Sequence, residues 1–262
     1  MPHVAALYRY PVKGFTAQTC EALTVLDEGR IAGDRVLGVR FADTPAADDA
    51  WGRKSGMLVL MNTPGLARLC VKFDEEQSRL HVSSETSVLA DEALTPEGRQ
   101  RIGAALARYA LELAENPLAG HPERLPLRVI GDGHSPRYHD EEPGRVTLHG
   151  RGSLEALQAA VGGDVSEIRF RSNIAVDGLA AWDELNWVGR GIRIGVVEFD
   201  VVSPKTRCLA THANPVTGER DVDVLSTLKR EFGQELPTFG VAMRPRGAGG
   251  QIRVGDRVTM LD

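Results

Sequence analysis

The sequence predicts a β-rich α/β (α+β) fold with a β-barrel core and only a few peripheral helices. Many short apolar stretches bounded by Gly, Pro or Asp have the length and composition of β-strands, whereas helical spacing is found in only three places. A nucleotide-binding βαβ array is not favoured. The chain has no Gly-x-Gly-x-x-Gly turn after a strand and no P-loop, and no helix follows its glycine-rich run at 247–250.

The N-terminal half is expected to consist mainly of short strands. They are predicted at residues 4–10, 23–26, 36–41, 57–61, 69–73 and 80–82. Pro11 ends the first strand because proline lacks an N–H group, so Lys13 falls at a strand end. The last two strands should form a hairpin that buries Cys70. Thr95 and Pro96 then cap and open an amphipathic helix that runs to about residue 116.

The C-terminal half begins after a proline-rich segment, 116–126, which is the best candidate for a linker. Ser153 is expected to cap a short helix that ends at Gly162, and Asp223 a second one that ends at Gly233. Strands are predicted at 146–148, 174–176, 192–194, 196–202, 239–243, 251–254 and 258–261. This pattern divides the chain into residues 1–116 and 117–262.

Composition restricts the classes of function. The net charge of −5 provides no general attraction for nucleic acid or for anionic membranes, so any anion site must be a local cluster. The chain has no run near the ~20 apolar residues that a membrane helix needs, and its start does not resemble a signal peptide. Three widely spaced cysteines do not form a disulfide framework. We therefore expect a cytoplasmic protein that binds neither nucleic acid nor membrane.

The most reactive group is expected to be the Cys208 thiol. It ends the stretch Ser-Pro-Lys-Thr-Arg-Cys at 203–208, directly behind an apolar strand. Positive neighbours favour a thiolate over a thiol, and the thiolate attacks electrophiles or binds soft metals. His212 lies four residues further on and could form a Cys–His pair if the loop folds back. A solvated thiol beside surface charges is the alternative.

Two arginines are candidates for anion binding. In an extended chain Arg169 and Arg171 share one face, so their guanidinium groups would point outward together. Ion pairs with Glu167 or Glu198 are the alternative. His134 and His139 lie in a polar loop, where solvent exposure is more common than metal binding.

Six motifs, taken together and in order, resemble the MOSC proteins, the relatives of the C-terminal domain of molybdenum-cofactor sulfurase. They are Tyr-Pro-Val-Lys-Gly at 10–14, Arg-Phe-Arg-Ser-Asn at 169–173, Asp-Gly at 177–178, Thr-Arg-Cys at 206–208, Asn-Pro-Val-Thr-Gly at 214–218 and Ile-Arg-Val-Gly-Asp at 252–256. The greatest similarity is to the branch with an N-terminal MOSC β-barrel domain, which includes the mitochondrial amidoxime-reducing component and its bacterial counterparts. The resemblance implies such a domain at 1–116, a MOSC domain at 117–262 and a cofactor site between them.

The resemblance also implies a molybdenum–molybdopterin cofactor. Cys208 would either ligate molybdenum or carry sulfur as a persulfide. The implied cofactor-binding residues are Lys13, Arg35, Ser153, Arg169, Arg171, Ser172, Asn173, Thr206 and Arg207. The Lys and Arg side chains suit a pterin phosphate, Ser172 and Asn173 could bond the pterin edge, and Ser153 lies at a helix N-terminus.

The function implied is reduction of N-hydroxylated or N-oxide small molecules by a molybdenum oxidoreductase. The alternatives are a sulfur-transfer protein and a cofactor carrier without its own chemistry. Arg151 stands where the amidoxime-reducing branch has an acid before Ser-Leu. We expect an external electron donor, such as a ferredoxin, flavoprotein or cytochrome-type reductase, because the chain carries no iron–sulfur or flavin motif.

Overall fold

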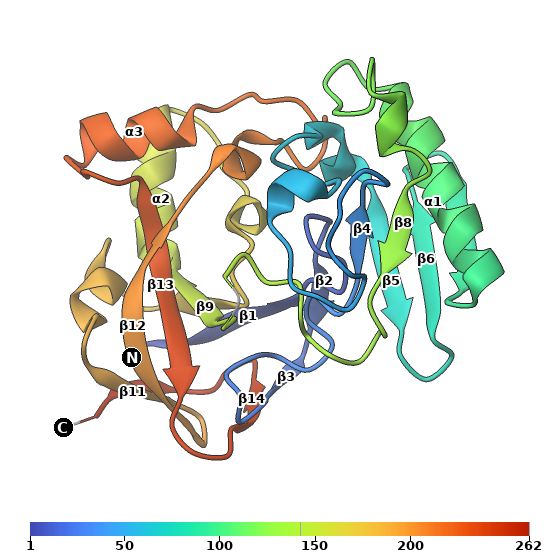
Figure 1. Cartoon of the computed structure of the whole chain (residues 1–262). Coiled ribbons are helices and arrows are strands. Elements are labelled where there is room, and N and C mark those ends of the chain that lie inside the picture. Colours follow the sequence, from blue (N-terminus) through green and yellow to red (C-terminus); the bar gives the residue numbers. More distant parts are fainter. Residues whose placement is uncertain (142, 262) are drawn as a thin grey trace.

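The computed structural model describes residues 1–141 and 143–261. The strands are β1 (His3–Arg9), β2 (Gln18–Cys20), β3 (Ala22–Val25), β4 (Gly38–Arg40), β5 (Cys70–Asp74), β6 (Arg79–Ser83), β7 (Val88–Ala93), β8 (Arg128–Ile130), β9 (Val146–Gly150), β10 (Ile174–Asp177), β11 (Gly191–Ile194), β12 (Val197–Thr206), β13 (Thr238–Pro245), β14 (Gly250–Arg253) and β15 (Val258–Met260). The helices are α1 (Pro96–Leu111), α2 (Arg151–Val161) and α3 (Val224–Glu231). The predicted β-rich fold with a few peripheral helices is confirmed (Figure 1).

The molecule has two parts, each of which contains residues from both halves of the sequence. One large sheet forms the centre of the first part. Its strand order is β15-β11-β12-β13-β9-β10-β1-β2, and only the β9–β10 pair is parallel. An isolated bridge between His3 and Arg257 brings the β15 side of the sheet against the start of β1. The sheet therefore curls toward a barrel, but among the described residues its strand ladders do not close into a complete ring.

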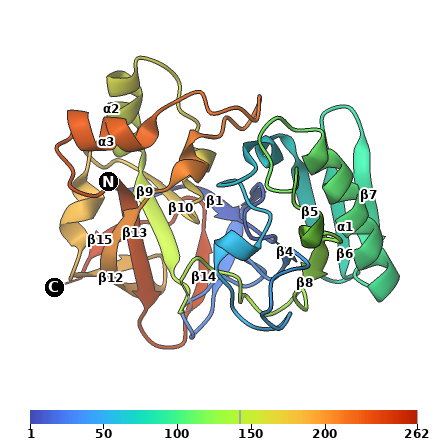
Figure 2. The same cartoon turned by 45° about the horizontal axis from the view of Figure 1, so that its top comes forward.

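The second part contains a three-stranded sheet, β5-β6-β7, and the short pair β4–β8. Helix α1 packs against β7 and β8 at the outer side of this part (Figures 1 and 2). Its buried face includes Ile102 and Leu106, which repeat at helical spacing. Gly103 lets the helix approach β8 closely, because a Cβ atom there would overlap the carbonyl oxygen of Leu127.

The first strands of the chain join the two parts. Strand β1 pairs with β10, and β3 pairs with β14. Beyond β1 the chain crosses into the second part, where Val12 bridges Leu37. Each of the two largest hydrophobic clusters thus contains residues from both sides of the predicted boundary at 116/117. The division of the chain into two domains at that boundary remains a prediction.

Several local expectations are corrected. The predicted hairpin is present as β5–β6, but Cys70 is exposed, because Val71 and Phe73 occupy the inward face of β5. Residues 57–61 do not form a strand and contribute one isolated bridge, at Met57. None of the helices in the described part of the chain is both long and apolar enough to cross a bilayer.

Two expectations at the predicted site residues are also corrected. Helix α2 begins at Arg151 with Gly150 as its N-cap, so Ser153 lies inside the first turn and is not the cap. Arg169 and Arg171 do not lie on one extended strand. Residues 167–170 form a 3₁₀ turn, and Arg171 has a left-handed backbone with φ 54°.

Candidate functional site

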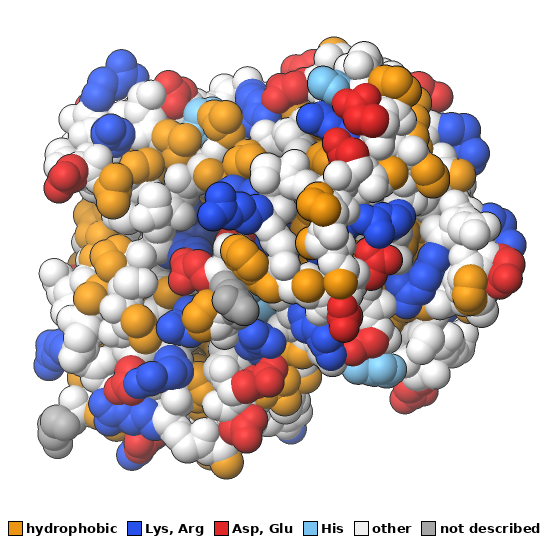
Figure 3. All heavy atoms as spheres, in the orientation of Figure 1, with side chains coloured by type: hydrophobic (Ala, Val, Ile, Leu, Met, Phe, Trp, Pro, Cys, Tyr) orange, Lys and Arg blue, Asp and Glu red, His pale blue; other side chains and the backbone are white. Residues whose placement is uncertain are grey.

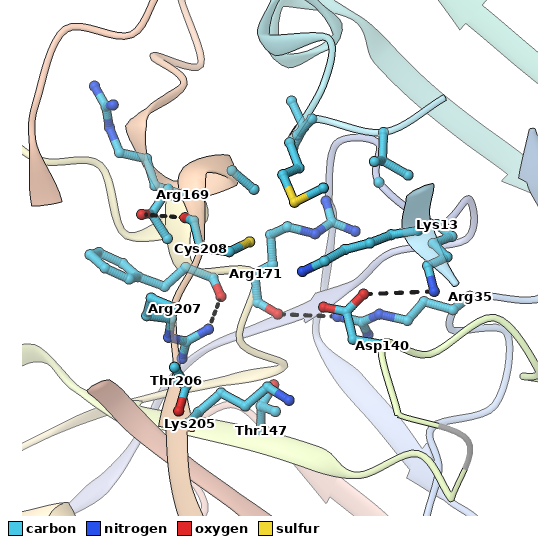
Figure 4. Close-up of a pocket in the computed structure, with 18 residues that line it drawn as sticks. Lys13, Arg35, Asp140, Thr147, Arg169, Arg171, Lys205, Thr206, Arg207 and Cys208 are labelled. Carbon is cyan, nitrogen blue, oxygen red and sulfur yellow. Dashed lines mark hydrogen bonds and ion pairs between the residues drawn. The ribbon is translucent and has the colours of Figure 1, made fainter. Parts of the chain in front are cut away.

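A pocket with about 700 Å³ of empty space, open solvent included, is lined by residues from both parts of the molecule (Figure 4). Its basic lining residues are Lys13, Arg35, Lys54, Arg169, Arg171, Lys205 and Arg207. Asp140 is the one acidic residue among the described residues that line it. Acidic and basic side chains are mixed on the face seen in Figure 3, and several of the pocket's cations lie beneath the surface. The positive charge is therefore concentrated locally inside the pocket.

Lys13 reaches the pocket because the chain turns sharply after β1. Its backbone N–H donates to the Leu37 carbonyl at 2.8 Å, and Gly14 follows with φ +78°. A side chain at Gly14 would overlap Val59, so only glycine fits this turn. The Lys13 side chain is 3% exposed, and its Nζ donates to the His139 carbonyl at 2.8 Å. Burial lowers the pKa of Lys13 to about 8; Arg35 and Lys54 act in the same direction, and Asp140 opposes them.

Arg35 and Arg171 lie together next to Tyr10. The Arg35 guanidinium pairs with the buried Asp34 carboxylate and donates to the Arg171 carbonyl at 3.3 Å. The Arg171 guanidinium donates to the Phe15 carbonyl and has no carboxylate partner among the described residues. Burial, reinforced by the positive charge of Arg35, lowers the pKa of Arg171 to about 10. Arg171 remains charged at neutral pH, and none of the carboxylates in the described part of the chain forms an ion pair with it.

Strand β12 delivers Thr206, Arg207 and Cys208 to the pocket. The Arg207 guanidinium donates to the carbonyls of Phe170 and Phe239, and, in the described chain, no carboxylate pairs with it. Burial lowers the pKa of Arg207 to about 10. Cys208 is half-buried, and its carbonyl accepts hydrogen bonds from the Thr211 hydroxyl and N–H, both at 3.0 Å. The Cys208 side chain points into the pocket in Figure 4.

Asp140 lies among the pocket's cations. One carboxylate oxygen is 3.7 Å from Lys13 Nζ (Figure 4). Loss of contact with water in the pocket disfavours the charged carboxylate. The positive charges of Lys13, Lys54 and Arg35 outweigh this effect and hold the pKa of Asp140 below its usual range. Asp140 is therefore ionised and offsets part of the positive charge of the pocket.

Not all of the predicted site residues meet here. Lys13, Arg35, Arg169, Arg171, Thr206, Arg207 and Cys208 line the pocket. The Arg169 guanidinium, however, turns to Asp221 and the His212 carbonyl, at 2.8 and 2.9 Å. Arg169 therefore forms an ion pair, which was the alternative to anion binding. Its partner is Asp221 and not Glu167 or Glu198.

Ser172, Asn173 and Ser153 are buried and do not line the pocket. Asn173 bonds Thr147 and the Tyr8 carbonyl, which ties β9, β10 and β1 together. The Ser153 hydroxyl donates to Glu184 at 2.8 Å. The cofactor contacts expected for these three residues remain predictions.

Sequence reasoning missed several lining residues. Lys54 and Lys205 add positive charge, Asp140 offsets it, and Leu60 and Met61 supply apolar surface. Lys205 stands within the same basic stretch as Cys208, so its charge was visible in the sequence. Asp140 lies in an irregular loop that has no periodicity, and nothing in the sequence singled it out.

The alternative chemistries have little geometric support. Nε2 of His212 accepts from the Leu225 N–H at 3.3 Å and lies 3.6 Å from Asp223, so this nitrogen is engaged at the start of α3. His134 is exposed, whereas His139 is buried, and burial lowers the pKa of His139 to about 3. No cluster of metal-binding side chains is found in the part of the chain that the structure describes.

Arg151, which stands where the amidoxime-reducing branch has an acid, also lies outside the pocket. Its guanidinium binds both carboxylate oxygens of Glu167, at 2.9 and 3.0 Å, and Asp177 at 3.3 Å. Arg151 therefore belongs to an ion-pair network beside the large sheet.

Comparison with known proteins finds a family match in the C-terminal half. Residues 136–259 match the family model of the MOSC domain. The molybdenum cofactor sulfurase of Caenorhabditis briggsae is 33% identical over 120 residues, which cover 45% of this chain and 16% of that protein. Mitochondrial amidoxime-reducing component 1 of Mus musculus is 34% identical over 134 residues, which cover 47% of this chain and 38% of that protein. The chain thus spans well under half of the length of these curated relatives.

A solved structure, the YUAD protein from Bacillus subtilis, resembles the chain over 98% of its length and 94% of that protein, with 11% identity and a TM-score of 0.42. The family match runs from before β9 into β15, and the pocket residues Arg171, Arg207 and Cys208 lie within it. Just under half of this chain, residues 136–259, is therefore similar to the MOSC domain.

Proposed function

We propose that the pocket holds a molybdenum–molybdopterin cofactor and that the protein reduces N-hydroxylated or N-oxide small molecules. The observation that carries the proposal is the pair of partly buried guanidiniums of Arg171 and Arg207, which have no carboxylate partners among the described residues and line the same pocket as Cys208. Charges withdrawn from water normally have an oppositely charged partner, so two partly buried guanidiniums without one indicate an anionic ligand. The similarity to a molybdenum cofactor sulfurase and to an amidoxime-reducing component supports a function associated with the molybdenum cofactor.

The donor set fits this cofactor. A phosphate group requires charged N–H donors, which Lys13, Arg35 and Arg171 supply from two regions of the chain. Molybdenum in sulfur coordination accepts a soft thiolate, and Cys208 is the one cysteine among the described lining residues. The apolar wall at Leu60 and Met61 suits the uncharged part of a ligand.

Each residue has a separate task in this proposal. Arg171 and Lys13 bind and orient the phosphate, and Arg35 adds a second guanidinium that Asp34 holds in place. Arg207 braces the strand end that carries Cys208, because its guanidinium bonds the carbonyls of Phe170 and Phe239. When bound, the cofactor would supply two-electron reduction with removal of the substrate's oxygen atom.

The electrons come from outside the chain in this scheme. Reduction of an N-hydroxyl group to an amine consumes two electrons and two protons and releases water. A ferredoxin, flavoprotein or cytochrome-type reductase is the class of partner that fits, since the sequence contains no iron–sulfur or flavin motif.

Sulfur transfer is the second candidate, and the match to a molybdenum cofactor sulfurase favours it. In that case Cys208 carries a persulfide. Analysis of protein made in a molybdopterin-competent host separates the two candidates, because the first requires stoichiometric molybdenum and the second requires sulfane sulfur without metal.

The decisive test is Cys208→Ser, with Cys70→Ser as the matched control on an exposed thiol. A serine hydroxyl is neutral at pH 7 and is a poor ligand for molybdenum in sulfur coordination, whereas the phosphate-binding side chains stay in place. We expect Cys208→Ser to retain pterin but lose reduction of an amidoxime driven by reduced viologen. Cys70→Ser should keep both properties. Full activity in Cys208→Ser would refute the ligand role of Cys208.

A further inference from the structure

We propose that Tyr10 is a positioning residue whose aromatic ring holds the guanidiniums of Arg35 and Arg171 in place for an anionic ligand. This inference rests on the proposed function, in that it assumes that the pocket binds an anion. Tyr10 opens the first of the six motifs, yet it does not line the main pocket itself. Its contacts connect it to two residues that do.

The ring lies within cation–π distance of both arginines. The guanidinium carbon of Arg171 is 4.3 Å from the ring centroid, and that of Arg35 is 5.0 Å away. The Tyr10 side chain is 1% exposed, so these contacts are shielded from water. Cation–π contacts are strongest in such desolvated settings.

An aromatic ring suits this place better than a carboxylate would. Two like charges close together repel, and burial adds to the cost of each. A carboxylate beside Arg171 would remove that cost but would also cancel the charge that attracts a ligand. The negative face of an aromatic ring stabilises a cation without a formal negative charge, so the guanidinium stays available to an anion.

Tyr10 also connects the two backbone segments that carry these arginines. Its carbonyl accepts from the Arg35 N–H at 2.7 Å, and its hydroxyl donates to the Ser172 carbonyl, next to Arg171, at 3.1 Å. Both Arg35 and Arg171 have a left-handed backbone, with φ 54° at each. Such a conformation is uncommon for a residue with a side chain and persists where surrounding contacts hold it. Tyr10 supplies contacts of this kind to the segment of Arg35 and to the segment of Arg171.

The experiment measures binding of inorganic pyrophosphate by calorimetry at pH 7 and low salt. Tyr10→Phe keeps the ring and should bind within about twofold of the wild type, whereas Tyr10→Leu should bind about 10-fold more weakly or worse, as expected for the loss of desolvated cation–π contacts. Tyr8→Leu is the matched control. Tyr8 is a buried tyrosine on β1 whose hydroxyl bonds Glu167 and which does not line the pocket.

Two further measurements separate positioning from general structural support. The effect of Tyr10→Leu should shrink to about twofold in an Arg171→Met background, because the ring then has one guanidinium fewer to orient. Phenylalanines with increasing ring fluorination at position 10 keep the shape but weaken the negative face, so affinity should fall stepwise with fluorination. This series answers the question even if Tyr10→Leu does not fold.

The outcomes are distinct. Wild-type protein that binds no pyrophosphate would contradict the anion pocket, and with it the proposed function. Wild-type binding that is unaffected by ring fluorination, or a Tyr10→Leu effect that is equally large without Arg171, would overturn the role of Tyr10 alone.

Discussion

Replacement of Lys13 by methionine should make the protein more stable at neutral pH while it weakens anion binding. Lys13 is 3% exposed, and its pKa of about 8 lies well below the value of 10.5 for a free lysine. A difference of this size means that keeping Lys13 charged in the folded state costs about 3 kcal/mol at pH 7. Methionine has a similar length and carries no charge.

The net gain in the free energy of unfolding of Lys13→Met is smaller than this cost. Lys13 Nζ donates to the His139 carbonyl at 2.8 Å, and loss of that hydrogen bond offsets about 1 kcal/mol. The His139 carbonyl keeps the indole N–H of Trp51 as a donor, at 2.9 Å, so it is not left without a partner. We therefore expect Lys13→Met to raise the free energy of unfolding by about 2 kcal/mol at pH 7.

The extra stability of Lys13→Met over the wild type should disappear as the pH rises. Below pH 8, Lys13 is protonated in both the folded and the unfolded state. Between pH 8 and 10.5 the folded state releases this proton first, so the unfolded state binds more protons and wild-type stability rises relative to the variant. Urea unfolding at pH 7 and pH 10 measures the difference, with the exposed Lys72→Met as the control. A variant that is less stable than wild type at pH 7 would refute the reasoning.

Two further changes test the charges of the pocket. Arg171→Ala should lose pterin and metal together, because a charge-assisted guanidinium contact contributes about 1.5–3 kcal/mol. Undiminished pterin in the purified variant, measured against Arg193→Ala as an exposed control, would contradict the assignment. Asp140→Asn should bind pyrophosphate about 3- to 10-fold more tightly, since it removes the one carboxylate among the described lining residues. Glu198→Gln, which removes a charge that does not line the pocket, should leave the affinity unchanged in the same calorimetric titration. Weaker binding by Asp140→Asn would mean that Asp140 contacts the ligand instead.

The sequence predicts the pocket best where a reactive side chain stands at a strand end. Lys13 follows a strand that Pro11 ends, and Cys208 follows β12, so both positions could be placed without coordinates. The strand β5 was also predicted correctly, but Cys70 was assigned to the wrong face. The alternation of side chains along a strand does not say which of its two faces points inward. In β5 the inward face carries Val71 and Phe73.

Left-handed backbone conformations limited the rest of the prediction. The left-handed backbone of Arg171 and the preceding 3₁₀ turn cancel the alternation that would have paired Arg171 with Arg169 on one face. Asn173 consequently bonds Thr147 inside the sheet and does not face the pocket. Arg171 lies against Tyr10, which is far away in the sequence, and a local pattern cannot reveal such contacts.

The pairing of the earliest strands with the latest ones has a consequence for how the chain acquires its structure during synthesis. Strand β1 can pair early with β2, but its other edge finds β10 only when β10 has been made, and β3 must wait for β14. The β5–β6–β7 meander and α1 need only their own neighbours in the sequence, so they can form while the ribosome is still translating the second half. Pairing between distant strands is slow because the intervening chain must close a long loop first. The outer edges of β1 and β3 should therefore remain available to chaperones and proteases until β10 and β14 have been made.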